Sequence, residues 1–271
     1  MTGSTLELRG VGAECVAVRS WVPPMDVKAS VLIVHGLAEH SGRFEHVGTF
    51  LSERGYRVTA LDLPGCGESG GRRSHMESIS EFHDAIEALV FELRDAGLPV
   101  ILYGHSLGGL TSLTYSLDPE RAQPDLLVLS APALDAEVPM WQRKSAPLLA
   151  RIAPTLALAN PVDGAHLSRD PSVAEAYFSD PLVYTKATVA FGAASFAAMA
   201  DAKERMGELD IPTYVFHGGQ DALVPPQFSA PLADLDCVTR RLWPSLRHET
   251  HNEPEWEDVL GELVAWLDER V

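Results

Sequence analysis

The sequence predicts an α/β fold, in which a mostly parallel eight-stranded sheet is flanked by helices and carries a helical cap insertion. Apolar and β-branched runs alternate with amphipathic helical patterns, which is typical of a parallel sheet covered on both faces. A glycine-flanked serine joins one of these runs to a helix of small residues. One long stretch breaks the alternation. We therefore expect a core at residues 1–131 and 201–271, and a cap at residues 132–200.

Eight runs are expected to form the sheet, and the first two resemble a leading antiparallel hairpin. Helical patterns with clear start and stop signals separate the later runs. In chain order the expected strands are Leu6–Arg9, Cys15–Val22, Val31–Val34, Arg57–Leu61, Val100–Tyr103, Leu126–Leu129, Thr213–Phe216 and Val238–Leu242.

Three amphipathic stripes predict helices that cover the sheet. The helix at Ser78–Ala96 begins with a Ser-x-x-Glu capping box, and Gly97-Leu98-Pro99 ends it. A second stripe runs through Phe44–Leu51, and a third runs through Trp256–Leu267. We interpret all three stripes as faces that pack on the core.

The stretch from residue 132 to residue 200 is rich in Ala, Pro and Leu and long enough for several helices. Its apolar runs Met140-Trp141 and Leu148–Ile152 lie beside the basic residues Arg143, Lys144 and Arg151. Such a pattern fits a helix that rests on a lipid interface. It also fits a helix that faces the rest of the cap, since Pro147 and Pro154 interrupt it.

Composition narrows the class of partner. The 271 residues are 46% hydrophobic and carry a formal net charge of -17, which argues against nucleic acid, disfavours tight docking on anionic membranes and favours a neutral substrate. The cysteines Cys15, Cys66 and Cys237 form no Cys-x-x-Cys pair, which argues against a disulfide framework.

No apolar stretch reaches about 18 residues, and the amino terminus lacks a basic-then-apolar leader. We therefore expect a cytoplasmic protein; the sequence makes no prediction of oligomeric state.

The most informative motif is Gly104-His105-Ser106-Leu107-Gly108, which directly follows a buried-type strand. Gly-x-Ser-x-Gly between a strand and a helix is a nucleophile elbow, because glycine at both flanks lets the strand and the helix approach without a clash. The motif predicts that Ser106 is an exposed nucleophile and that the chain is a serine hydrolase.

A serine hydroxyl is a poor nucleophile near neutral pH, so Ser106 needs a histidine base and a carboxylate that orients this base. After such an elbow the acid precedes the histidine in the chain. The glycine-rich turn after Thr213–Phe216 presents Asp221, which we expect to be the acid. Asp135 is the alternative, although no glycine turn presents it.

The histidine is expected on the loop after the last strand, where the chain offers His248 and His251. We favour His248 because His251 abuts the start of the final helix. A metal site at these two residues is disfavoured, since the histidines of zinc-protease helices are four residues apart and Pro244 and Pro254 flank this segment.

The tetrahedral intermediate of acyl transfer needs two preorganised amide donors. The Leu107 amide follows the nucleophile directly. The Leu37 amide follows His35-Gly36 after an early strand, where glycine leaves the backbone free to turn toward the pocket.

Four segments together resemble the monoacylglycerol lipase and lysophospholipase branch of the α/β-hydrolase superfamily. They are His35–Phe44 (HGLAEHSGRF), Asp62–Gly71 (DLPGCGESGG), Gly104–Gly109 (GHSLGG) and His248-Glu249. The chain departs from the usual pattern in three places, with Ala38 for Gly, Cys66 for His and Leu107 for Met.

The resemblance implies a triad of Ser106, Asp221 and His248, with oxyanion donors at Leu37 and Leu107. It also implies no cofactor, no metal and a mobile cap that admits a single acyl chain. We therefore expect cleavage of carboxylic esters, above all monoacylglycerols, through an acyl-serine intermediate. A lysophospholipase, a short-chain carboxylesterase and a catalytically weak ligand receptor with the same fold are the alternatives.

Overall fold

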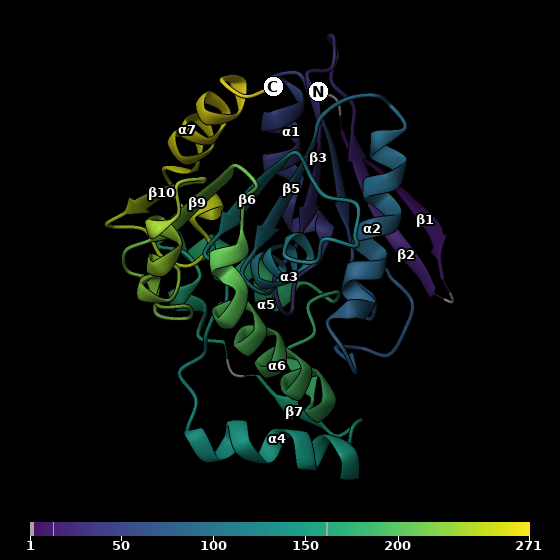
Figure 1. The fold of residues 1–271 in the computed structure, drawn as a ribbon, viewed down its shortest axis with the longest axis vertical. Coiled ribbons are helices and arrows are strands. Elements are labelled where there is room, and N and C mark those ends of the chain that lie inside the picture. The colour runs from purple at the N-terminus through teal and green to yellow at the C-terminus, as the bar shows by residue number, and fades with distance from the viewer. Residues whose placement is uncertain (1–2, 13, 161) are drawn as a thin grey trace.

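An eight-stranded sheet runs through the computed structural model, which describes residues 3–12, 14–160 and 162–271 (Figure 1). The strand order is β1-β2-β4-β3-β5-β6-β9-β10. The strands are β1 Thr5–Val11, β2 Glu14–Trp21, β3 Ala29–Val34, β4 Tyr56–Leu61, β5 Val100–His105, β6 Leu126–Ser130, β9 Thr213–Gly218 and β10 Val238–Trp243. All eight expected strands are present, and the mostly parallel sheet is confirmed. Met1, where the expected core begins, and Pro161 in the expected cap lie outside the described residues.

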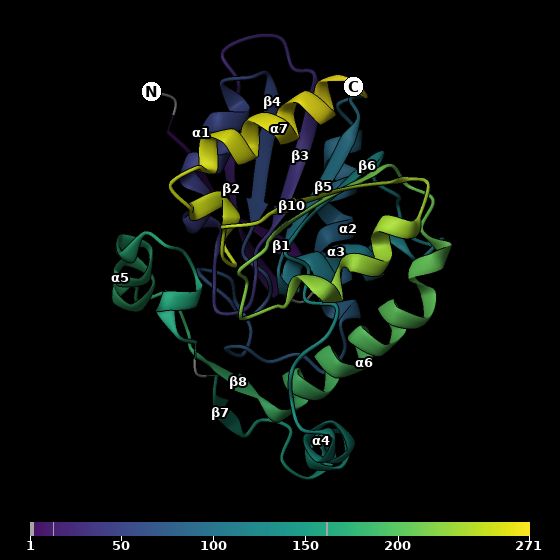
Figure 2. The same ribbon diagram turned by 90° about the vertical axis from the view of Figure 1, so that its left-hand side faces the viewer.

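The two faces of the sheet are covered by different helices. The helices α1 (Glu45–Ser52) and α7 (Trp256–Asp268) lie together over one face, as Figure 2 shows, whereas α2 (Ser80–Arg94) and α3 (Leu107–Ser116) cover the other. Alternate side chains of a strand point to opposite faces. The side chains of β3 follow this rule: Val31 and Ile33 pack in the α1/α7 cluster, while Leu32 and Val34 pack in the α2/α3 cluster.

Parallel pairing brings the ends of the central strands to one edge of the sheet. In the register, Val34 of β3 lies opposite Gly104 of β5, His105 opposite Ser130 of β6, and Trp243 of β10 opposite Gly218 of β9. Ligand sites in such sheets form outside the carboxyl ends of the strands. The loops that carry the predicted site residues all leave the sheet at this edge.

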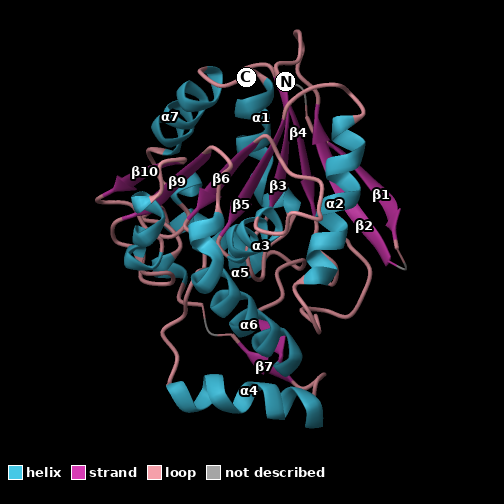
Figure 3. Cartoon of the chain, in the orientation of Figure 1, coloured by secondary structure: helices cyan, strands magenta, loops and turns pink. Residues whose placement is uncertain are grey.

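The segment between β6 and β9 extends away from the sheet, and α4 is its outermost element (Figure 3). It consists of α4 (Met140–Ile152), β7 (Ala157–Ala159), α5 (Pro171–Ser179), β8 (Lys186–Thr188) and α6 (Val189–Arg205). An antiparallel β7–β8 pair, which the sequence did not predict, accompanies these helices. The expected boundary at residue 200 falls inside α6, and buried side chains of α6 pack in the core cluster. The division into core and cap stays a proposal.

Short 3-10 helices complete the elements. They are η1 (Ser41–Phe44), η2 (Gly164–His166), η3 (Met206–Glu208), η4 (Pro226–Phe228), η5 (Ala230–Asp234) and η6 (Thr250–Asn252). Within the described ranges, no helix has the length and hydropathy that crossing a membrane requires.

Candidate active site

Ser106 lies at the turn between β5 and α3 with φ 52° and ψ -115°, a conformation that non-glycine residues rarely adopt. Its two flanking glycines are sterically required. A Cβ atom on Gly104 would lie 2.3 Å from the carbonyl oxygen of Gly108, and one on Gly108 would lie 2.1 Å from that of Val34. Close packing of strand and helix therefore holds the strained turn, as expected for a nucleophile elbow.

The structure brings the three predicted side chains together in one hydrogen-bonded chain. His248 Nε2 lies 3.0 Å from Ser106 Oγ, and His248 Nδ1 lies 2.7 Å from Asp221 Oδ2. All three residues are buried, and Ser106, which the motif predicts to be exposed, has only 9% of its surface exposed. Because an ionised carboxylate only accepts hydrogen bonds, Asp221 holds the proton on Nδ1 and leaves Nε2 free to accept the serine proton.

The two alternatives from the sequence lie elsewhere. Asp135 forms ion pairs with Arg143 and Lys203. The His251 ring stacks on Phe44 at a centroid distance of 5.0 Å. In the described part of the chain neither ring nitrogen of His251 has a hydrogen-bond partner, and burial lowers its pKa to about 3.

Several donors converge on the Asp221 carboxylate. Its Oδ1 accepts the amides of Leu223 at 2.9 Å and Val224 at 2.8 Å, and its Oδ2 lies 3.1 Å from Nε2 of the buried His217. Burial alone would raise the pKa of Asp221, but His248 and these hydrogen bonds hold that pKa well below its usual range. The acid therefore stays charged. No contact with Asp221 was predicted for His217, which stands four residues before it in the same turn.

The groups around His248 favour its protonated form. Burial alone would lower the pKa of His248, but the charge of Asp221 and the hydrogen bond to it raise that pKa above the ordinary histidine value. The neighbouring His105, with its ring centroid 4.9 Å from that of His248, is fully buried, and burial holds its pKa well below the usual range. Of these two histidines, His248 is therefore the one whose surroundings favour the gain of a proton.

The two expected oxyanion donors belong to the start of α3 and to the loop after β3. Leu107 is the first residue of α3, so no acceptor within that helix is available to its amide. The loop after β3 comes close on the other side, because a Cβ atom on Gly36 would lie 3.1 Å from Ser106 Cβ. Within the described ranges, no acceptor is recorded for the amide of Leu37 or Leu107. Their catalytic role stays a prediction.

A buried charged cluster lies behind the Leu37 loop, and we call Glu39, Arg43 and Glu249 the charge bracket. Glu39 Oε2 accepts the Gly36 amide at 2.8 Å, and Arg43 contacts the other oxygen of Glu39. The Arg43 guanidinium also donates two bonds of 2.8 Å to Glu249, the residue after His248. The bracket was part of the sequence resemblance, but no role was predicted for it.

The two carboxyl groups of the bracket differ in charge. Burial and the nearby Glu249 charge raise the pKa of Glu39 to about 7, although Arg43 opposes this rise. For Glu249 the paired Arg43 overcomes burial and lowers the pKa to about 2. Arg43 therefore stabilises the charged form of Glu249 more strongly than that of Glu39.

The loop that carries His248 is also held by the segment that precedes α5. The Glu249 amide donates to Leu167 O at 2.8 Å. The carboxylate of Glu253, whose side chain has no exposed area, accepts the amides of Arg247 at 2.6 Å and Arg169 at 3.0 Å. These bonds fix one part of the expected cap against the loop that carries His248.

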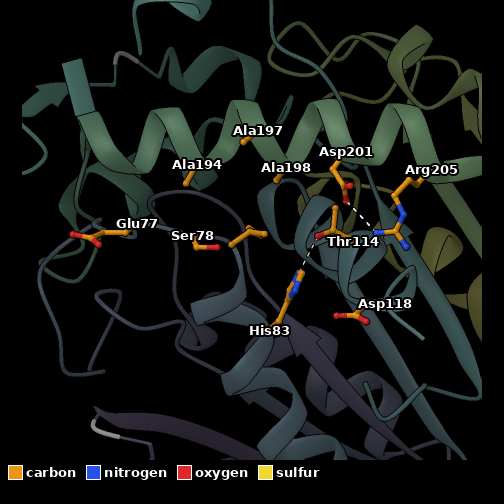
Figure 4. Close-up of a pocket in the computed structure, with 11 residues that line it drawn as sticks. Glu77, Ser78, His83, Thr114, Asp118, Ala194, Ala197, Ala198, Asp201 and Arg205 are labelled. Carbon is orange, nitrogen blue, oxygen red and sulfur yellow. Dashed lines mark hydrogen bonds and ion pairs between the residues drawn. The ribbon is translucent and has the colours of Figure 1, made fainter. Parts of the chain in front are cut away.

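A pocket between α2, α3 and α6 lies outside this site (Figure 4). Its residues include His83, whose Nε2 is 3.0 Å from Thr114 Oγ1, and Arg205, which pairs with Asp201. None of the three predicted catalytic residues lines it. Over the described ranges, no cluster of His, Cys, Asp or Glu has the arrangement of a metal site.

Comparisons with known proteins identify the family and the fold of the chain. The family model described as serine aminopeptidase, S33, matches residues 25–255. The monoacylglycerol lipase of Mycolicibacterium smegmatis is 34% identical over 98% of this chain and 97% of that protein. The crystal structure of the Paleococcus ferrophilus monoacylglycerol lipase superposes with a TM-score of 0.86 at 32% identity, covering 98% of this chain and 100% of that one. A soluble variant of the Saccharomyces cerevisiae monoglyceride lipase, solved with a substrate analog, gives a TM-score of 0.90 at 20% identity over 100% and 97% of the two chains.

Proposed function

The chain belongs to the serine aminopeptidase S33 family, has the α/β-hydrolase fold and is a carboxylic ester hydrolase, and from this premise we propose that it hydrolyses monoacylglycerols through an acyl intermediate on Ser106. The observation that carries the proposal is the hydrogen-bonded chain from Ser106 Oγ through His248 to Asp221. Support for the substrate class comes from two relatives, each about one third identical, that are named monoacylglycerol lipases.

Acylation begins when Ser106 Oγ attacks the ester carbonyl carbon while His248 Nε2 takes the hydroxyl proton. The carbonyl oxygen becomes an oxyanion, and the amides of Leu37 and Leu107 donate to it. The intermediate collapses, the bond to the glycerol oxygen breaks, and His248 returns its proton to that oxygen. Asp221 keeps the imidazole oriented and stabilises its positive charge in both steps.

Deacylation repeats these steps with water as the nucleophile. His248 takes a proton from a water molecule that attacks the acyl carbon, and the same two amides stabilise the second oxyanion. The Ser106–acyl bond then breaks, and Ser106 Oγ regains its proton from His248. One ester and one water thus yield one alcohol and one fatty acid.

The outer helix α4 is proposed to contact the lipid surface that presents the substrate. Its exposed residues include Trp141, Leu148 and Ile152, at 66%, 61% and 72% exposure. These apolar groups stand beside the exposed cations Lys144 and Arg151, although the chain as a whole carries a net charge of -17. An apolar face with basic flanks suits an anionic lipid interface, and the strong negative net charge disfavours nucleic acid as a partner.

The substrate class is tested with a panel of monoacylglycerols, diacylglycerols, lysophospholipids and p-nitrophenyl esters, with Ser106→Ala as the control. We expect the highest kcat/KM on a monoacylglycerol and no turnover by Ser106→Ala. Preference for a lysophospholipid or a short p-nitrophenyl ester would overturn the substrate assignment and keep the mechanism. A parent protein that binds lipid and turns over none of the panel would indicate a ligand receptor.

A further inference from the structure

The loop that carries the Leu37 amide contains a strained residue. Ala38 has φ 57° and is 3% exposed, so it adopts the left-handed conformation inside the protein. For an L-residue other than glycine this conformation is costly, because Cβ approaches the backbone carbonyl oxygen. Strain of this kind persists only where the surroundings hold it.

Ala38 packs in an apolar cluster with Leu167 and Tyr177, and the polar contacts that can hold this loop come from the charge bracket. On one side of Ala38, the Gly36 amide is bound by the carboxylate of Glu39 at 2.8 Å. Arg43 fixes that carboxylate from behind, and its own guanidinium is fixed by two bonds to Glu249 and by the Tyr177 ring, 4.8 Å away. The Glu39 carboxylate therefore closes the four-residue turn from Gly36 to Glu39, and Arg43 in turn holds that carboxylate in place.

The burial of the bracket also indicates a positional role. Its side chains are only 9% (Arg43), 4% (Glu39) and 2% (Glu249) exposed. Taking such charges out of water costs about as much as their attraction returns, so a buried ion pair adds little net stability. What the pair does supply is a fixed geometry, and it links the loop of Leu37 to the residue beside His248.

We propose that Glu39 and Arg43 are positioning residues, which hold the loop with Ala38 in its left-handed conformation so that the Leu37 amide faces the developing oxyanion. This inference rests on the proposed function, since it assigns the Leu37 amide as an oxyanion donor. Without the bracket, Ala38 relaxes toward negative φ and turns the adjoining peptide groups away from Ser106. The loss falls on the transition state, because the oxyanion forms only there.

The test combines substitutions of the bracket with relief of the strain. Glu39→Gln keeps the volume of the side chain and removes its charge, and Arg43→Lys keeps the charge and removes the fork geometry. Each is made with Ala38 and again with Ala38→Gly, because glycine adopts positive φ without strain. Steady-state kcat and KM are measured with a p-nitrophenyl ester, and thermal melting checks that each variant is folded. Glu262→Gln, which breaks the exposed Arg241–Glu262 pair, is the matched control.

In the Ala38 background we expect kcat to fall about 10- to 100-fold, somewhat less than the loss of a whole oxyanion donor, with KM changed by less than about threefold. In the Ala38→Gly background the same substitutions should cost about 5- to 30-fold less, which corresponds to the strain relieved. The control should stay at the parent rate. If Glu39→Gln does not fold, Arg43→Lys carries the same comparison.

Three results would overturn the inference: kcat near the parent value in both bracket variants, a rise in KM that accounts for the whole loss, or a loss that Ala38→Gly leaves unchanged. The last would show that the bracket acts otherwise than by holding the left-handed residue. Failure of the proposed function is distinguishable, because then the parent itself cleaves no ester or Ser106→Ala remains active.

Discussion

Replacing the acid by its amide tests the role of Asp221 with little change in shape. In Asp221→Asn the amide oxygen can still accept from Leu223 and Val224, and the new NH2 group replaces the oxygen that lies 2.7 Å from His248 Nδ1. An NH2 group donates where the carboxylate oxygen accepted. The imidazole then carries its proton on Nε2, and this tautomer accepts no proton from Ser106. We expect kcat to fall about 10,000-fold, or about 5.5 kcal/mol in the barrier.

The assay is steady-state hydrolysis of a p-nitrophenyl ester, with thermal melting to show that the variant is folded. Asp135→Asn is the matched control, because Asp135 was the alternative acid and pairs with Arg143 and Lys203 instead. It should retain most of the parent activity. Activity of Asp221→Asn near the parent rate, or an equal loss in Asp135→Asn, would refute the assignment.

Three further predictions concern pH, packing and lipid binding. Because Asp221 raises the pKa of His248 and the reaction needs the neutral imidazole, kcat/KM should fall with decreasing pH along a limb whose midpoint lies above pH 6.5. Gly108→Ala places a Cβ atom 2.1 Å from the Val34 carbonyl oxygen, so we expect a loss of about 2–3 kcal/mol and a Tm lower by several degrees. Trp141→Gln combined with Ile152→Gln should weaken sedimentation with anionic vesicles and leave hydrolysis of a dissolved ester intact.

Each of these has an outcome that contradicts it. An acid limb of the pH profile centred below pH 6.5 would count against the Asp221–His248 pairing. Glu39, whose pKa is raised to about 7, could also contribute to this limb, so the profile is repeated with Glu39→Gln to distinguish the two groups. Gly261→Ala in α7, where an added Cβ atom meets nothing within 4 Å, should leave Tm unchanged or raise it. Vesicle binding is contradicted if the double variant binds like Leu8→Gln, which removes an apolar group 64% exposed on β1.

The sheet and the candidate triad could be predicted from sequence because their signals are local. The central strands are apolar, β-branched runs that are buried throughout, and the glycine-rich turns that carry Ser106 and Asp221 directly follow two of these runs. The preference for His248 over His251 also rested on a local signal, the start of the last helix. In the structure His248 reaches both partners, and the His251 ring packs on Phe44.

The charge bracket could not be predicted because it depends on distant pairing. Arg43 and Glu249 are 206 residues apart, and nothing in either local pattern announces the bond between them. Glu39 and Arg43 are four residues apart, a spacing that could have suggested a contact had their loop been expected to form a helical turn. The left-handed Ala38 was equally hidden, because alanine gives no sequence signal for positive φ. The resemblance did show that Ala38 replaces the family's usual glycine, but this difference did not predict the backbone conformation of Ala38.

The β7–β8 pair was missed for a different reason. Each strand has three residues, which is too short for a period-two pattern to emerge in a stretch rich in alanine. Residues 132–200 were therefore expected to form several helices and no strand was predicted there. An alternating apolar and polar pattern identifies a strand only when one face of the strand is buried. No residue of β7 is buried, so its sequence carries no such pattern.

The central claim is that the Ser106 hydroxyl is the group that attacks the ester carbon. Intact-protein mass spectrometry after reaction with a fluorophosphonate, followed by peptide mapping, tests it most directly. We predict one adduct per chain on Ser106, a loss of esterase activity in proportion to labelling, and no adduct in Ser106→Ala. Labelling of another residue that abolishes activity, or an active parent that never acquires an adduct on Ser106, would contradict the claim.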